Sequence, residues 1–160
     1  MMEELKITAS TKEGIYDEII GQIEDLTAIE SDCIANMANI CAILKETFDF
    51  WWVGFYLVKK EQLVLGPFQG PLACTRINFG KGVCGTSWKE KKTIIVDDVE
   101  KFPGHIACSS HSRSEIVVPL FKDDSIWAVL DIDSEKLNNF DQIDLEKLEI
   151  LTKLLNYEKI

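Results

Sequence analysis

Six short runs rich in β-branched and aromatic residues fill the middle of this chain, and they constrain its fold more than any other feature. They are WWVGFYLV (51–58), QLVLGPFQG (62–70), LACTRINF (72–79), TIIV (93–96), SEIVVPLF (114–121) and SIWAVLDID (125–133). Apolar stripes predict amphipathic helices before them at residues 12–28 and 31–48, and Asp141 is a suitable N-cap for a helix after them. Because helices do not alternate with the strands, we expect an α+β fold rather than a doubly wound one. A central antiparallel sheet of about six strands should carry the N- and C-terminal helices on one face.

Composition limits the class of protein and its partners. With 46% hydrophobic and 28% charged residues, the 160-residue chain is expected to form one globular domain, 1–160. No apolar run approaches the ~20 residues of a membrane span, and the first residues do not resemble a signal peptide, so a cytoplasmic location is predicted. The formal net charge of −10 argues against nucleic acid as a ligand.

The chain has five cysteines, an odd number without a CxxC motif, and a reducing compartment does not favour a disulfide scaffold. Each thiol is therefore judged by its surroundings. Cys41 lies on the apolar stripe of the second helix and Cys33 lies beside the start of that stripe. Both are predicted to pack as small hydrophobic residues.

The other three cysteines lie in more polar surroundings. Cys84 begins a predicted short helix in GKGVCG, where free N–H groups favour either a thiolate of lowered pKa or a ligand carboxylate. The alternative is a small residue that fills a tight turn. Cys108 lies in the loop HIACSSHSRSE between His105 and His111, and its basic neighbours favour the nucleophilic thiolate. Cys74 lies in a predicted strand, where core packing is the simpler interpretation.

The loop also permits a metal interpretation. His105, Cys108 and His111 are spaced three residues apart, and zinc accepts both ligand types. No second cluster of paired ligands in the sequence supports such a site, so no metal is predicted.

Acidic residues are expected to gather at one end of the sheet. Asp131 and Asp133 are two residues apart on a strand and therefore share a face. If 114–121 and 125–133 form a hairpin, Glu115 lies beside them. Neighbouring carboxylates tend to split their pKa values, which suits binding a cation or donating a proton, although a solvated strand end is the simpler alternative.

The run WWVGFYLV places Trp52, Gly54 and Tyr56 on one face of a strand. Gly54 leaves room between the two rings, so this face could form a small aromatic pocket for a thioether, methyl or ammonium group. Aromatic residues in a strand more often belong simply to the core.

Together, WVGFYL, LGPFQG, ACTRI, GKGVCGT, GHIAC, SRSEIVVPL and VLDIDS resemble the free methionine-(R)-sulfoxide reductases, single-domain enzymes of the GAF fold. The resemblance covers residues 50–135 and includes three cysteines and three acids. Two features depart from the family pattern: Trp51 stands where an asparagine is usual, and SSH follows GHIAC in place of Asp-Ala.

The resemblance implies a GAF fold around a small-molecule pocket and reduction of the R epimer of free methionine sulfoxide. Cys108 matches the nucleophilic cysteine, Cys74 the resolving cysteine, and Cys84 a third family cysteine whose role stays open. The positions that match substrate-holding residues are Glu115, Asp131, Asp133, Trp52 and Tyr56.

The chemistry expected from these residue types needs no cofactor. A carboxyl group of raised pKa protonates the sulfoxide oxygen, a thiolate attacks sulfur, and the resulting sulfenic acid condenses with a second thiol to a disulfide. Thioredoxin is the expected reductant of that disulfide. A homodimer through the terminal helices is a further expectation. The alternatives are a GAF sensor that binds a small ligand and a thiol redox sensor without a dedicated substrate.

Overall fold

The computed structural model describes residues 4–104 and 111–155. Each of its two N-terminal helices begins after a residue whose side chain caps it. Helix α1 (Lys12–Ile29) follows Thr11, whose side chain accepts a hydrogen bond from the Gly14 N–H. Helix α2 (Cys33–Phe48) begins two residues later than predicted because Asp32 caps it. None of the helices in the described ranges has the length and apolarity that crossing a membrane requires.

The strands form one six-stranded antiparallel sheet of order β3-β2-β1-β6-β5-β4, which confirms the predicted α+β class. They are β1 (Trp52–Lys59), β2 (Gln62–Gln69), β3 (Arg76–Asn78), β4 (Ile94–Val96), β5 (Ser114–Lys122) and β6 (Ser125–Ser134). Strands β1, β6 and β5 are buried over most of their length, whereas the edge strands β3 and β4 have three residues each. Short edges limit unwanted pairing with other chains.

One predicted strand is mostly wrong. Residues 72–79 were expected to be extended, but only Arg76–Asn78 pair with β2. Residues 71–75 lie outside the strand, although the Thr75 carbonyl still accepts from the Leu65 N–H of β2. The Pro71 and Cys74 carbonyls accept instead from side chains of β1. A proline at position 71 cannot donate to a ladder, which is consistent with pairing that starts later.

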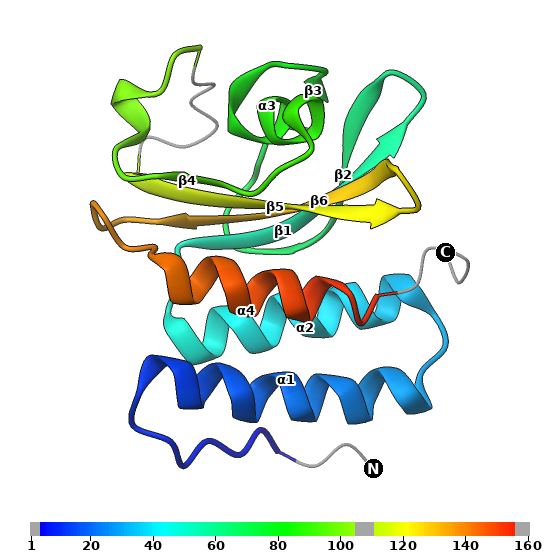
Figure 1. Ribbon diagram of the computed structural model, residues 1–160, viewed down its shortest axis with the longest axis vertical. Helices are drawn as coiled ribbons and strands as arrows, with labels where there is room; N and C mark the ends of the chain where they lie inside the picture. The colour runs from blue at the N-terminus through cyan, green and yellow to red at the C-terminus, as the bar shows by residue number, and fades with distance from the viewer. Residues whose placement is uncertain (1–3, 105–110, 156–160) are drawn as a thin grey trace.

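Helices cover both faces of the sheet (Figure 1). As predicted, the terminal helices lie on one face: α2 and α4 (Gln142–Thr152) pack on it, and α1 lies outside them. The short helix α3 (Gly82–Glu90) and the 3₁₀ turn η1 (Val99–Lys101) lie on the opposite face. A large apolar core fills the first side and a smaller one fills the second, where the polar residues of interest also lie.

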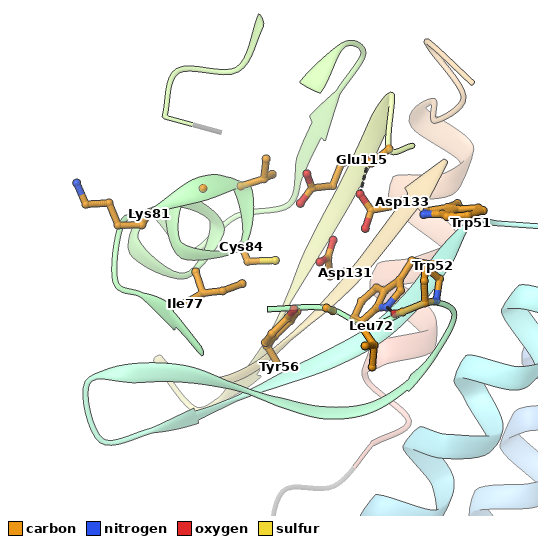
Figure 2. Close-up of a pocket in the computed structure, with 15 residues that line it drawn as sticks. Trp51, Trp52, Tyr56, Leu72, Ile77, Lys81, Cys84, Glu115, Asp131 and Asp133 are labelled. Carbon is orange, nitrogen blue, oxygen red and sulfur yellow. Dashed lines mark hydrogen bonds between the residues drawn. The ribbon is translucent and has the colours of Figure 1, made fainter. Parts of the chain in front are cut away.

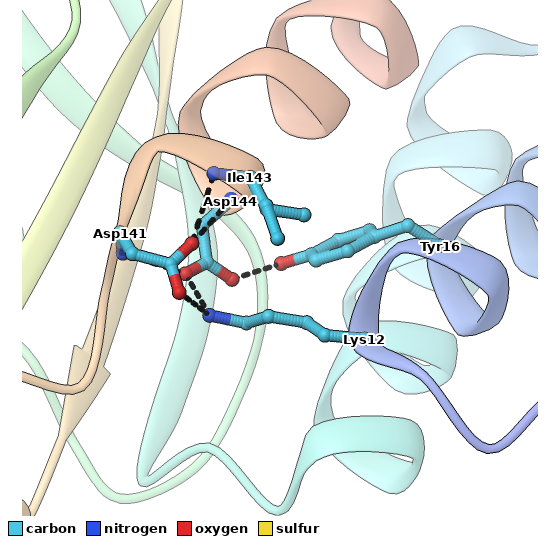
Figure 3. A network of polar contacts seen from close by, with 5 residues as sticks. All are labelled: Lys12, Tyr16, Asp141, Ile143 and Asp144. Atoms are coloured by element: carbon cyan, nitrogen blue, oxygen red, sulfur yellow. Dashed lines mark hydrogen bonds and ion pairs between the residues drawn. The ribbon is translucent and has the colours of Figure 1, made fainter.

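A buried carboxylate fixes α1 to the start of α4 (Figure 3). Asp141 caps α4 as predicted, and Asp144 completes a capping box by accepting from the Asp141 N–H. Asp144 is fully buried, accepts from the Tyr16 hydroxyl at 2.8 Å and pairs with Lys12. Because each of these groups satisfies another, the network holds the outermost helix in place without an unpaired buried charge.

Candidate active site

Three acidic side chains meet at one end of the β5–β6 hairpin, as predicted. Glu115 lies opposite Asp133 in the ladder, and Val117 lies opposite Asp131. Residues two apart on a strand share a face, so the three carboxyl groups converge on the side of the sheet that α3 covers (Figure 2). Glu115 and Asp131 are each 6% exposed, which places both carboxyl groups out of bulk water.

The predicted aromatic face of β1 lies beside these acids. The register pairs Trp52 with Asp133 and Gly54 with Asp131. The rings of Trp52 and Tyr56 stack with centroids 5.9 Å apart. A Cβ atom on Gly54 would lie 2.2 Å from Cη2 of Trp52. Glycine is therefore required here, because it makes the space that the Trp52 ring fills.

Both aromatic side chains also hold the chain segment that carries Cys74. Trp52 Nε1 donates to the Pro71 carbonyl at 3.1 Å, and the Tyr56 hydroxyl donates to the Cys74 carbonyl at 2.9 Å. Cys74 is part-buried and is disulfide-bonded. The predicted strand is wrong at this position, since ladder pairing begins only at Arg76. The predicted packing is supported, because Cys74 packs against the smaller apolar core.

The remaining described cysteines carry free thiols. Cys33 and Cys41 are buried in the core on the helical face, which confirms their predicted packing role. Burial raises the pKa of both thiols above the ordinary value, and Asp32 adds to the effect at Cys33. Neither is suited to act as a nucleophile.

Cys84 lies in the first turn of α3, as predicted, but its electrostatics are the reverse of the expected ones. The thiol is 3% exposed and points toward Asp131 (Figure 2). Desolvation raises its pKa well above the ordinary value, and the Asp131 and Glu115 carboxyl groups raise it further. Burial beside acids therefore outweighs the helix dipole, and the prediction of a lowered pKa is wrong.

The carboxyl groups have raised pKa values for the same reason. Desolvation is the largest cause for Glu115 and Asp131, followed by repulsion from neighbouring carboxylates, and the pKa of each lies well above its usual range. Burial raises the pKa of Asp133 to about 6, although a hydrogen bond from Ser112 opposes the shift. These shifts favour the protonated form of the carboxyl groups, and a protonated carboxyl group could donate its proton to a ligand.

The structure adds two residues that sequence reasoning passed over. Ser112 donates a short hydrogen bond to Oδ1 of Asp133 and lines the same pocket. Trp51 also lines it, and its ring stacks on His111 with centroids 4.8 Å apart. A serine three residues before Glu115 gave no signal by itself. Trp51 was visible only as a departure from the family pattern.

Cys108 and His105 lie outside the described residues, so the predicted role of Cys108 stays a prediction. The zinc interpretation of this loop, which the sequence did not favour, is not tested either. All other predicted site residues except Cys74 line one pocket: Trp52, Tyr56, Cys84, Glu115, Asp131 and Asp133. Its volume is about 50 Å³, well below the ~300–1,000 Å³ of sites for drug-sized ligands. Its small volume and its three acids favour a small polar ligand over a nucleotide.

The raised pKa of Asp133 predicts a pH-dependent stability. An unfolded aspartate titrates near pH ~4, whereas Asp133 in the fold titrates at about 6. The protonated form thus favours the fold below pH ~4, and this contribution is lost as the pH rises through 6. In the wild type, this loss should lower the free energy of unfolding by about 1–3 kcal/mol between pH 4 and 7. Asp133→Asn should abolish that part of the decrease, as measured by urea titration at each pH. Asp124→Asn, in the exposed β5–β6 turn, is the control; equal pH profiles for both variants would contradict the assignment.

Comparisons with known proteins show the family of the chain. The GAF domain family model matches residues 37–155. GAF domain-containing protein A of Dictyostelium discoideum is 59% identical over 157 residues, 98% of this chain and 99% of that protein. The free methionine-R-sulfoxide reductase of Saccharomyces cerevisiae is 42% identical over 154 residues, 91% of this chain and 86% of the yeast protein.

Among solved structures, this chain is similar to the X-ray structure of free methionine-R-sulfoxide reductase from Neisseria meningitidis in complex with its substrate. The TM-score is 0.95 at 53% identity, over 99% of this chain and 96% of that one. The resemblance predicted from the sequence motifs is confirmed at the level of sequence and of fold. The chain belongs to the free methionine-R-sulfoxide reductase family of GAF-domain proteins.

Proposed function

We propose that this protein reduces the R epimer of free methionine sulfoxide to methionine. One observation supports the proposal above all: three carboxyl groups, a buried thiol and two stacked aromatic rings line one small pocket, and Tyr56 of that pocket holds a disulfide-bonded cysteine. Family membership gives the substrate class, because the related protein of Neisseria meningitidis is described as bound to its substrate.

The pocket offers a partner for each part of a free amino acid. The ammonium group would pair with the carboxylates of Asp131, Asp133 and Glu115. The methyl sulfoxide end would lie against the rings of Trp52 and Tyr56. The substrate carboxylate would bind the first turn of α3, where no side chain caps the free N–H groups. A methionine within a peptide lacks both charged termini and would therefore be rejected.

The reaction we infer balances without a cofactor. A protonated carboxyl group donates its proton to the sulfoxide oxygen, and the Cys108 thiolate attacks the sulfur. The oxygen leaves the substrate sulfur as water. Water then attacks the Cys108 sulfur and breaks its new bond to the substrate sulfur, so methionine leaves and Cys108 is oxidised to a sulfenic acid. A second thiol displaces the sulfenic oxygen as water and forms a disulfide. A dithiol reductant, which we take to be thioredoxin, then returns both cysteines to thiols.

Cys74 is the better candidate for the second thiol. It is disulfide-bonded, whereas the other described cysteines, Cys33, Cys41 and Cys84, are free. We propose Cys108 as its partner, as the resemblance to the reductase family implies. Cys84 is poorly suited to resolve a sulfenic acid, because the thiolate is the reactive form and the pKa of this thiol is raised.

Tyr56→Phe should separate the two stages of the reaction. The variant keeps the ring against the substrate but loses the hydrogen bond to the Cys74 carbonyl. Losing one such bond costs about 1 kcal/mol, so we expect disulfide formation to slow about fivefold while the first methionine forms at nearly the normal rate. Rapid-quench measurements of methionine and of free thiols test this. Disulfide formation at the wild-type rate would show that the hydrogen bond does not position Cys74.

The two alternative functions are less well supported by the pocket. A sensor for cyclic nucleotides would have to bring a phosphate into a small cavity lined by three acids. A thiol redox sensor would need no substrate pocket, so the convergence of acids and aromatic rings would have no purpose.

We further propose that the chain works as one domain in the cytoplasm, and that a homodimer can form through its terminal helices.

Product analysis with both epimers tests the proposed function. The reduced protein is incubated with the R or the S epimer of free methionine sulfoxide, and with the N-acetylated R epimer, which has no ammonium group. We expect about one methionine per protein from the free R epimer and almost none from the other two. Thiol oxidation by peroxide with no response to any sulfoxide would identify a redox sensor instead. Binding without thiol oxidation would identify a ligand sensor.

A further inference from the structure

A buried sulfur and buried carboxylate oxygens converge at the base of the pocket. One ligand atom each from Cys84, Glu115 and Asp131 lie within 4.8 Å of one another, and all three residues are buried. The thiol comes from α3, and the carboxylates come from the two strands of the β5–β6 hairpin (Figure 2). Elements on both sides of the cavity thus supply donors that face one space.

One buried carboxylate oxygen of this cluster has no hydrogen-bond partner among the described residues. The oxygen is Oδ1 of Asp131, a residue that is only 6% exposed. The described lining of the pocket includes one basic residue, Lys81, which is exposed and points away from the acids in Figure 2. A buried carboxylate oxygen without a partner is costly, and a cation in the cavity would satisfy it.

We propose that this cavity binds a thiophilic divalent cation, Zn²⁺ or Cd²⁺, through Cys84, Glu115 and Asp131. One sulfur and two oxygens form a borderline-soft donor set, which favours these ions over Mg²⁺. Donors around a tetrahedral zinc lie about 3.6 Å apart for bonds of ~2.1–2.3 Å. Small rotations of the three side chains would therefore close the site, and water in the cavity would complete the coordination.

Metal binding has a consequence for the reaction. The ion would occupy the space where the substrate ammonium group pairs with the same carboxylates, so metal and substrate compete. This competition rests on the proposed function, whereas the binding itself does not. Coordination releases to solvent the thiol proton of Cys84 and any proton that Glu115 and Asp131 carry, and it leaves the oxidation state of every group unchanged. The ion would therefore be a reversible inhibitor rather than a cofactor.

Cadmium titration of the oxidised protein tests the site directly. Oxidation removes Cys74 as a competing ligand, and a thiolate bound to Cd²⁺ gives an ultraviolet charge-transfer band. We expect the band in the wild type and in Cys33→Ser, whose thiol lies in the opposite core, but not in Cys84→Ser. No band in the wild type, or a band that persists in Cys84→Ser, would overturn the proposal. Mg²⁺ in large excess should not displace the Cd²⁺.

A second variant keeps the test valid if Cys84→Ser does not fold. Asp131→Asn removes one ligand and leaves the thiol in place. We expect Zn²⁺ affinity, measured by calorimetry, to fall at least about 100-fold, which exceeds the usual effect of losing a supporting residue. Unchanged affinity would overturn the site. Free methionine sulfoxide should raise the apparent dissociation constant of Zn²⁺; failure of this arm alone would count against the proposed substrate and not against the metal site.

Discussion

Cys108→Ser should abolish steady-state reduction of methionine sulfoxide, lowering kcat by roughly 10⁴-fold or more. Serine keeps the size of the side chain but lacks a nucleophile that can attack sulfoxide sulfur and be oxidised. Substrate affinity should be retained, because the proposed binding groups belong to β1, β5, β6 and α3 rather than to this residue. The measurement is methionine formed per minute with thioredoxin, together with binding of the R epimer by calorimetry.

Cys33→Ser is the matched control for this variant, since its thiol is buried in the core on the helical face. It should turn over at close to the wild-type rate. Cys108→Ser with full activity would refute the nucleophile assignment, whatever the position of the other thiols. Loss of both activity and binding would instead mean that residue 108 belongs to the substrate pocket itself.

Cys74→Ser should permit one turnover and then stop. The first methionine forms because Cys108 attacks the substrate without help from Cys74, but the sulfenic acid then has no resolving thiol. We expect a burst of about one methionine per protein, followed by a steady-state rate at least about 100-fold below the wild type. Quantifying methionine at early and late times, and trapping the sulfenic acid chemically, checks both parts.

Cys84→Ser provides the comparison that decides between the two candidate thiols. Because its thiol is protonated and buried beside Asp131, we expect this variant to form a disulfide after one turnover, although its substrate affinity will change. Sustained turnover by Cys74→Ser, lost when Cys84 is also replaced, would mean that Cys84 resolves the sulfenic acid.

Much of the site follows from short-range patterns in the sequence. Asp131 and Asp133 share a face because side chains alternate along a strand, and a short turn after Phe121 was enough to bring Glu115 beside them. The same alternation placed Trp52 and Tyr56 on one face of β1. These predictions succeeded because the hairpin geometry and the strand period together fix the positions of the side chains.

The failures have a common physical cause, which is that burial depends on distant residues. Cys84 was expected to have a lowered pKa from its helix terminus, but acids 31 and 47 residues away in the chain make its surroundings desolvated and negative. The segment around Cys74 has a strand-like composition, yet its pairing begins only at Arg76, and its carbonyls accept hydrogen bonds from the side chains of Trp52 and Tyr56. No local pattern contains either fact.

The most direct test is peptide mapping of the reduced protein after one equivalent of the free R epimer, followed by alkylation and mass spectrometry. One methionine should appear for each disulfide formed, and that disulfide should join residues 74 and 108 while Cys84 is recovered alkylated. If methionine is released and residue 108 is also recovered as an alkylated thiol, no electrons came from it, and the account of the reaction is wrong.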